Sequence, residues 1–170
     1  MQHRFFSYAF VQKNYRELCL ERKIILWSQT VTVLGCFLPW AAYQPIYGAI
    51  IEYNAFFGSA WLMGFVVLCL SFSAFALMLE RLLEKNWFTK KIPETTLLLA
   101  GGFQSLVLLI CIGSVLSADG QHYSESVIRF GYFMCLGAQV TNFVALLLLF
   151  QDQKKQAVVD FFVRPDSGKK

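Results

Sequence analysis

The sequence predicts an all-α integral membrane protein, in which four transmembrane helices form an up-down bundle with both termini in the cytoplasm. The first observation is composition: 56% of the 170 residues are hydrophobic, only 15% are charged, and the mean hydropathy is +0.50. A soluble domain is nearer one quarter charged. The second observation is that the apolar residues gather in four blocks, none of which contains Asp, Glu, Lys, Arg or His. The blocks are residues 24–42, 57–79, 95–117 and 130–150.

Each block predicts one helical span. Its length is close to the ~20 residues with which a helix crosses a ~30 Å hydrocarbon core. A helix in the core of a soluble protein would carry a charged face, and a barrel strand would alternate polar with apolar residues, but the blocks do neither. The first block is the weakest, because Pro39 and Trp40 lie at its end. The chain thus divides into a cytoplasmic N-terminal segment (1–23), which either lies in the interface or caps the bundle, a four-span bundle (24–150) and a cytoplasmic tail (151–170).

The distribution of Lys and Arg predicts the orientation. Of the 15 basic residues, all except Arg129 lie in residues 1–23, in the connection between the second and third blocks, or after residue 150. The positive-inside rule places these three regions in the cytoplasm. Basic residues at membrane edges anchor helices to anionic headgroups, so the net charge of +4 indicates the lipid bilayer as a partner and not nucleic acid. Neither outer connection holds an Asn-x-Ser/Thr acceptor, and this with the compact loops favours a bacterial inner membrane.

Cysteines and histidines argue against redox, haem and metal cofactors. A membrane thiol–disulfide oxidase needs cysteine pairs at the outer surface, but the predicted outer connections contain no cysteine. Haem relays need axial ligands within the spans, and His3 and His122 both lie outside them. Asp119, His122 and Glu125 share one outer connection, but their spacing matches no metal motif. We therefore expect no catalytic, cofactor-binding or metal-binding residue, and no enzyme.

Three amide side chains fall near the middle of spans. Gln104 lies in the third, and Gln139 and Asn142 lie in the fourth, three residues apart and hence on one face. Amides are costly to expose to lipid tails, so we expect the three to meet in the interior as polar contacts between helices. A hydrophilic path through the midplane is the other interpretation.

Small residues recur at helical spacing in every span. Small side chains let helix backbones approach closely in a membrane. The pattern fits packing within one bundle and packing against other subunits equally well. The stripes are Ser28, Thr32 and Gly35; Ala60, Gly64, Ser71 and Ala74; Gly102, Ser105 and Gly113; and Gly131, Cys135, Ala138, Asn142 and Ala145.

Two segments outside the spans are unusually apolar. The first outer connection, residues 41–56, holds a single charge, Glu52, and is either a loop in the interfacial aromatic belt or a patch that docks a partner. The tail run 157–163 is also too apolar to remain in water at low cost, and would fold back on the bilayer or insert into a neighbouring protein. The candidate docking residues are Tyr43, Tyr47, Tyr53, Phe56, Phe161 and Phe162.

These observations predict a function by elimination. We expect a non-catalytic four-helix membrane subunit or scaffold that assembles with other integral membrane proteins. The alternative is a small oligomeric channel or carrier whose path is lined by Gln104, Gln139 and Asn142.

Overall fold

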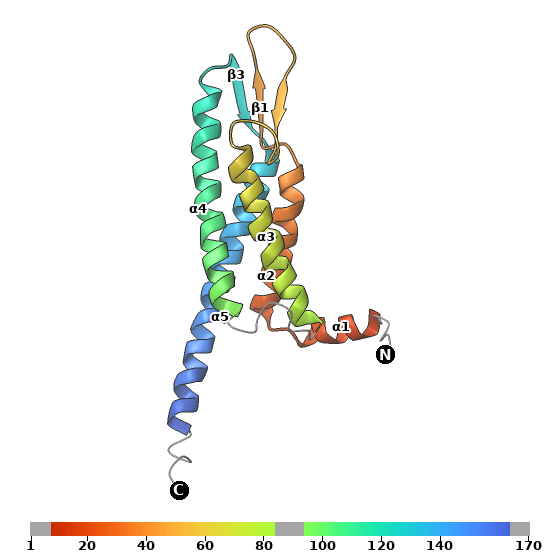
Figure 1. Ribbon diagram of the computed structural model, residues 1–170, viewed down its shortest axis with the longest axis vertical. Coiled ribbons are helices and arrows are strands. Elements are labelled where there is room, and N and C mark those ends of the chain that lie inside the picture. Colours follow the sequence, from red (N-terminus) through yellow and green to blue (C-terminus); the bar gives the residue numbers. More distant parts are fainter. Residues whose placement is uncertain (1–7, 84–93, 164–170) are drawn as a thin grey trace.

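The computed structural model describes residues 8–83 and 94–163, and within them the chain is mostly helical. One short helix lies across one end of the molecule, and four longer helices run side by side (Figure 1). Each long helix packs against two others, in the order α2, α3, α4, α5 and back to α2. The helices are α1 (Tyr8–Glu17), α2 (Leu20–Phe37), α3 (Trp61–Leu82), α4 (Glu94–Gly120) and α5 (Phe130–Val163).

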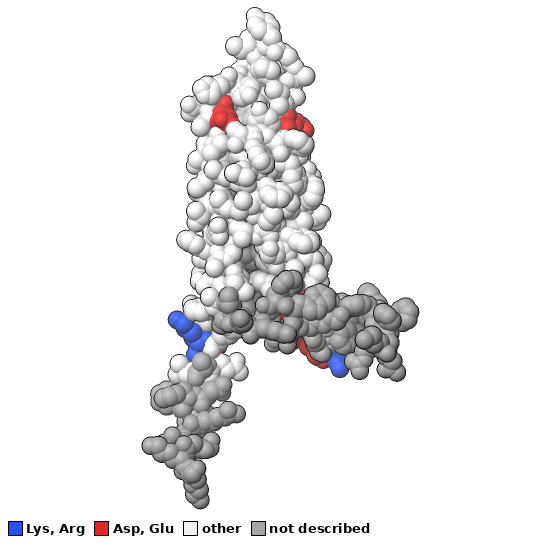
Figure 2. Space-filling view, viewed as in Figure 1, with Lys and Arg blue, Asp and Glu red and all other residues white. Residues whose placement is uncertain are grey.

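Three of these helices are long and apolar enough to cross a membrane: Trp61–Glu80 within α3, Thr95–Gly120 within α4 and Phe130–Gln156 within α5. Their outer faces carry exposed Phe, Leu, Ile and Val side chains. Figure 2 shows no charged side chain along the middle of the bundle on the face it draws. The chain is thus a multi-pass membrane protein whose helices suit a lipid environment. α2 is less apolar than the other three, because Glu21, Arg22 and Lys23 occupy its first turn.

The first apolar block extends past the helix that it predicts. α2 ends at Phe37, and Leu38 is extended, with φ −83° and ψ 157°. Pro39 explains this end, because a proline disfavours helical backbone at the residue before it. The Gly35 carbonyl near the helix end accepts from the Leu38 N–H at 3.2 Å and also from the Trp40 indole Nε1 at 2.9 Å.

A small antiparallel sheet covers the end of the bundle opposite α1 (Figure 1). Its central strand β1 (Ala41–Gln44) pairs with β2 (Ile51–Tyr53) on one side and with β3 (Glu125–Ile128) on the other. The all-α prediction missed this sheet. Strands of three or four residues leave almost no alternating pattern, and β3 lies more than eighty residues from β1, so local sequence does not reveal the pairing.

The interior contains two apolar clusters with a polar layer between them. The cluster nearer the sheet includes Trp40, Val67, Leu109, Ile112 and Cys135. The cluster nearer α1 includes Ile25, Met78, Leu98, Leu146 and Leu149. On every long helix buried polar residues fall between these two groups, and we call them the polar layer: Gln29 and Thr32 on α2, Ser71 on α3, Ser105 on α4, and Gln139 and Asn142 on α5.

The small-residue stripes face the inside of this one chain. All of them except Gly113 and Ala138 are buried. A Cβ added at Gly35 would lie 2.6 Å from Cys135 Sγ, and one at Gly131 would lie 2.6 Å from the Pro39 carbonyl oxygen. These glycines let α2 and α5 approach closely. The structure therefore assigns most of the stripes to packing within the chain.

Candidate functional site

The polar layer is organised around Gln139 of α5. Its side chain is fully buried, and its Nε2 lies 3.3 Å from Gln29 Oε1, 3.1 Å from Thr32 Oγ1 and 3.1 Å from Ser71 Oγ. An amide nitrogen carries two hydrogens, so three acceptors compete for two donors. Gln139 thereby links α5 to α2 and to α3.

Asn142 extends the layer by one helical turn. Its Nδ2 donates to Gln139 Oε1 at 3.2 Å, as expected for side chains three residues apart on one helix face. Asn142 Oδ1 is buried and has no hydrogen-bond partner among the described residues. Gly102 of α4 makes room for this amide, because a Cβ there would lie 3.0 Å from Asn142 Nδ2. The structure thus brings Gln139 and Asn142 together in the interior.

Gln104 does not join them, which corrects the expectation that all three amides meet. Its side chain is exposed on α4, and the neighbouring Ser105 is the buried residue at that level. Rotation by about 100° per residue separates the two faces, and the small Ser105 fits where the helices are close. Gln29 is a member of the layer that the sequence did not predict, because it lies near the start of the block 24–42 and not at its centre.

Tyr43 belongs to the core of the sheet and is not available to a partner, which corrects its assignment as a docking residue. Only 1% of its surface is exposed, and its hydroxyl donates to the Leu116 carbonyl of α4 at 2.7 Å. Its ring stacks on Tyr123, with centroids 4.8 Å apart, and meets Tyr53 edge-on at 5.1 Å. Burial, followed by the negative charge of Asp119, raises the pKa of Tyr43 from 10 to about 12. The position is buried because β1 is the central strand of the sheet.

The other outer candidates differ in exposure. Tyr53 and Phe56 are half-buried, and the Phe56 ring lies 5.1 Å from Phe37 at the end of α2. Tyr47 lies in the connection between β1 and β2 and is 93% exposed. Of the four outer candidates, Tyr47 is therefore the one that projects away from the protein.

Phe161 and Phe162 fall in the last turns of α5, and their side chains lie outside the described residues. α5 continues as one helix through this segment and extends away from the bundle (Figure 1). The backbone of this segment therefore makes no turn back toward the bundle, and whether it lies on the bilayer or inserts into a neighbouring protein stays a prediction.

Asp119, His122 and Glu125, the three possible metal ligands of the second outer connection, have different surroundings. Ser59 donates a hydrogen bond to the Asp119 carboxylate, and His122 and Glu125 are both exposed. Within residues 8–83 and 94–163, no group of three or more His, Cys, Asp or Glu side chains is arranged to hold a metal ion.

Comparison with known protein families, with curated proteins and with solved structures found no match to this chain.

Proposed function

We propose that the protein is a non-catalytic membrane subunit that assembles with another integral membrane protein through the tip of its outer hairpin. The observation that carries this proposal is the exposure of four apolar side chains in and beside the connection between β1 and β2. Together they form what we call the hairpin tip: Ile46, Tyr47, Ile50 and Ile51.

The four side chains of the hairpin tip lie outside the core of the sheet, because all of them are exposed. Tyr43 already fills the space above α4, and the tip projects beyond the bundle (Figure 1). On the face that Figure 2 draws, no charged side chain lies at the far tip, and the acidic residues of that face lie lower, where the sheet meets the bundle. Exposed apolar side chains in one uncharged patch are typical of protein contact sites.

The polar layer supports a packing role for the interior. Gln139 and Asn142 bond to neighbours within the chain, and Gln104, the third amide of the alternative channel, lies on an exposed face. A path through one bundle would need these groups to face a common opening. We therefore prefer the subunit to the channel or carrier.

We further propose that α2 crosses the membrane with the other three long helices, with both termini on the cytoplasmic side. Residues 24–37 rise about 21 Å as a helix, and the extended residues 38–40 add about 10 Å, which together match a ~30 Å core. α2 packs along α3 and α5, and Ile25, Gln29 and Thr32 are buried there. A charged first turn would then lie at the cytoplasmic headgroups.

Site-specific photo-crosslinking tests the assembly. A photoreactive side chain replaces Tyr47 at the hairpin tip in intact membranes. A matched variant carries the same group at Gln121, which is also exposed and lies at the same end of the molecule. We expect a discrete adduct with one other integral membrane protein at Tyr47 and none at Gln121. Adducts with lipid alone at Tyr47, or equal adducts at both positions, would contradict the proposal.

A further inference from the structure

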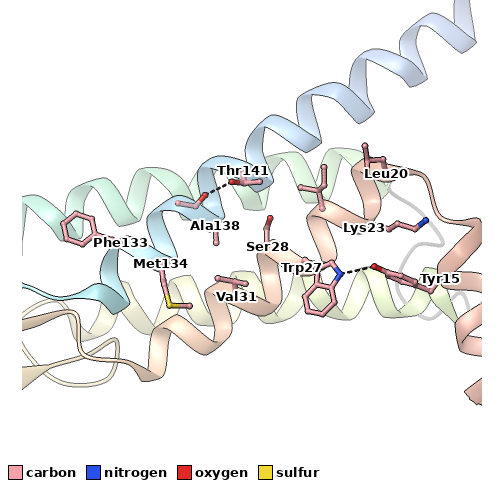
Figure 3. A pocket seen from close by; sticks show the side chains of 12 residues that line it. Tyr15, Leu20, Lys23, Trp27, Ser28, Val31, Phe133, Met134, Ala138 and Thr141 are labelled. Carbon is pink, nitrogen blue, oxygen red and sulfur yellow. Dashed lines mark hydrogen bonds between the residues drawn. The ribbon is translucent and has the colours of Figure 1, made fainter.

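A groove with a volume of about 610 Å³ lies between α2 and α5 and reaches the end of the bundle nearer α1. Lys23, Leu20 and Tyr15 lie at one end of this groove, and Phe133 and Met134 lie at the other (Figure 3). The groove exists because both helices present small side chains there. They are Ser28 of α2 and Gly137, Ala138 and Thr141 of α5.

One end of the groove is polar and positively charged. Lys23 is the single charged residue in its lining. Its Nζ donates to the Arg16 carbonyl at 3.1 Å and lies 5.4 Å from the centroid of the Tyr15 ring. An ammonium group has three hydrogens, so Lys23 keeps donors for a ligand. Among the described residues it forms no ion pair.

Tyr15 and Trp27 form a wall beside this charge. The Trp27 indole Nε1 donates to the Tyr15 hydroxyl oxygen at 3.0 Å, as Figure 3 shows. The Tyr15 hydroxyl accepts this bond and retains its own hydrogen as a donor. The hydroxyl and the Lys23 ammonium are thus both suited to an anionic oxygen at the mouth of the groove.

The groove has the length of one leaflet. From Ile24, the first residue after the charged turn, to Val31, α2 rises about 11 Å, which lies within one leaflet of a ~30 Å hydrocarbon core. An acyl chain of a phospholipid occupies one leaflet, which matches this depth, and its headgroup would lie at the level of Lys23. Beyond Phe133, toward the start of α5, the helix no longer contributes to the groove.

We infer that this groove binds one anionic phospholipid, with an acyl chain against Gly137 and Ala138 and the headgroup phosphate at Lys23 and Tyr15. The inference is independent of the hairpin tip, because it concerns the other end of the molecule and needs no protein partner. A basic side chain at the headgroup depth gives the site its preference for negative charge.

Two glycines provide a matched test of the acyl-chain contact. A Cβ at Gly137 meets nothing within 4 Å, and the same holds at Gly101 of α4, which is outside the groove. Gly137→Leu should therefore fill the groove without disturbing the fold, and Gly101→Leu should leave it open. The purified full chain is reconstituted in vesicles of phosphatidylglycerol and phosphatidylcholine and extracted in mild detergent. The lipid retained per protein is then measured by native mass spectrometry.

We expect about one phosphatidylglycerol to remain bound to the unmodified chain and to Gly101→Leu, and at least a five-fold smaller fraction to remain on Gly137→Leu. Circular dichroism confirms that each variant is folded. Equal retention by the two glycine variants would overturn the inference. Unchanged lipid retention by Gly137→Leu would also overturn it, and loss of a membrane protein that co-purifies with the unmodified chain from native membranes would identify the groove as a contact for a partner helix.

A second pair of variants tests the charge. Lys23→Gln should lower the preference for phosphatidylglycerol over phosphatidylcholine about five-fold, the effect of one basic residue near an anionic surface. Lys154→Gln is the control, because Lys154 also lies over an aromatic ring, 4.7 Å from the centroid of Phe150, but lies outside the groove. If both variants lower the preference equally, the effect is general surface charge and the site is absent.

Discussion

Gln139 Nε2 on α5 donates a hydrogen bond to Ser71 Oγ on α3 at 3.1 Å, and both side chains are buried between two apolar clusters. Polar groups in this position are expensive to leave without partners, because no water replaces a lost bond. The layer therefore fixes the relative position of α2, α3 and α5 along their axes.

Replacing the central amide should destabilise the bundle. Gln139→Leu leaves Asn142 Nδ2 without its acceptor and removes the donor to Ser71, so we expect a loss of about 1–2 kcal/mol in unfolding free energy. Gln104→Leu should change stability by less than about 0.5 kcal/mol, because that amide is exposed. Chemical unfolding in mixed micelles measures the unfolding free energy of both variants.

The double variant Gln139→Leu with Asn142→Leu should cost less than the sum of the two single changes, since removing both partners avoids an orphaned group. Insertion should be normal, because both changes make α5 more apolar. A Gln139→Leu protein as stable as the unmodified chain would show that the layer contributes nothing to the fold.

Gly64 of α3 should not tolerate a larger side chain. A Cβ at this position would lie 2.8 Å from the Ala55 Cα, which is backbone and does not move easily. We expect Gly64→Ala to destabilise the protein by about 1–3 kcal/mol. Gly101→Ala is the matched change in open space, and should be neutral or stabilise α4 by up to about 1 kcal/mol. Equal thermal stability of the two variants would contradict this packing.

The membrane-spanning helices could be predicted because a lipid environment requires long runs of residues without charge. Charge-free blocks of about 20 residues mark α3, α4 and the first part of α5. Pro39 explains why α2 ends before the end of its block. The sheet could not be predicted, because its strands have only three or four residues and β3 pairs with β1 from more than eighty residues away.

The polar layer was predictable only in part, for a related reason. Sequence shows that Gln104 and Gln139 lie at mid-depth but does not show which way each faces. Contacts with the neighbouring helices determine how each helix is rotated about its axis, and hence which residues face the interior. The small residue Ser105 was the available signal that Gln104 faces outward, since small residues mark the close contacts.

Stability should fall in strong alkali because of Tyr43. Its pKa is raised from 10 to about 12 in the folded protein, so folding favours the neutral phenol. The corresponding stabilisation is complete below pH 10 and is lost as the pH rises toward 12. Tyr43→Phe should lose about 1 kcal/mol at neutral pH with the bond to the Leu116 carbonyl, and should show a weaker pH dependence between pH 10 and 12. Thermal melting across this pH range compares the two proteins, and identical slopes would contradict the assignment.

The hairpin tip should affect assembly but not folding. Ile46→Ser with Tyr47→Ser removes two exposed side chains, so the melting temperature of the isolated chain should stay within a few degrees. Loss of buried anchors at an interface typically costs more than ~2 kcal/mol of binding, so the partner that crosslinks at Tyr47 should no longer co-purify.

Tyr53→Ser serves as the comparison, because it should affect folding. Its ring contacts Tyr43 inside the sheet, so this change should lower the melting temperature of the isolated chain. If the double variant at the tip retains its partner, the exposed apolar side chains lie among lipid headgroups and have no role in assembly.

Thiol labelling in intact cells should establish the orientation. We expect an impermeant maleimide to react with Cys introduced at Tyr47 or at Gln121, because both side chains are exposed at the end of the molecule that the distribution of Lys and Arg places outside. Cys19 is a natural control, since it is exposed in the connection between α1 and α2 and should react only after the membrane is permeabilised. Cys introduced at Lys154 should behave like Cys19. Labelling of Cys19 in intact cells would reverse the orientation, and would place the Lys23 end of the α2–α5 groove in the outer leaflet.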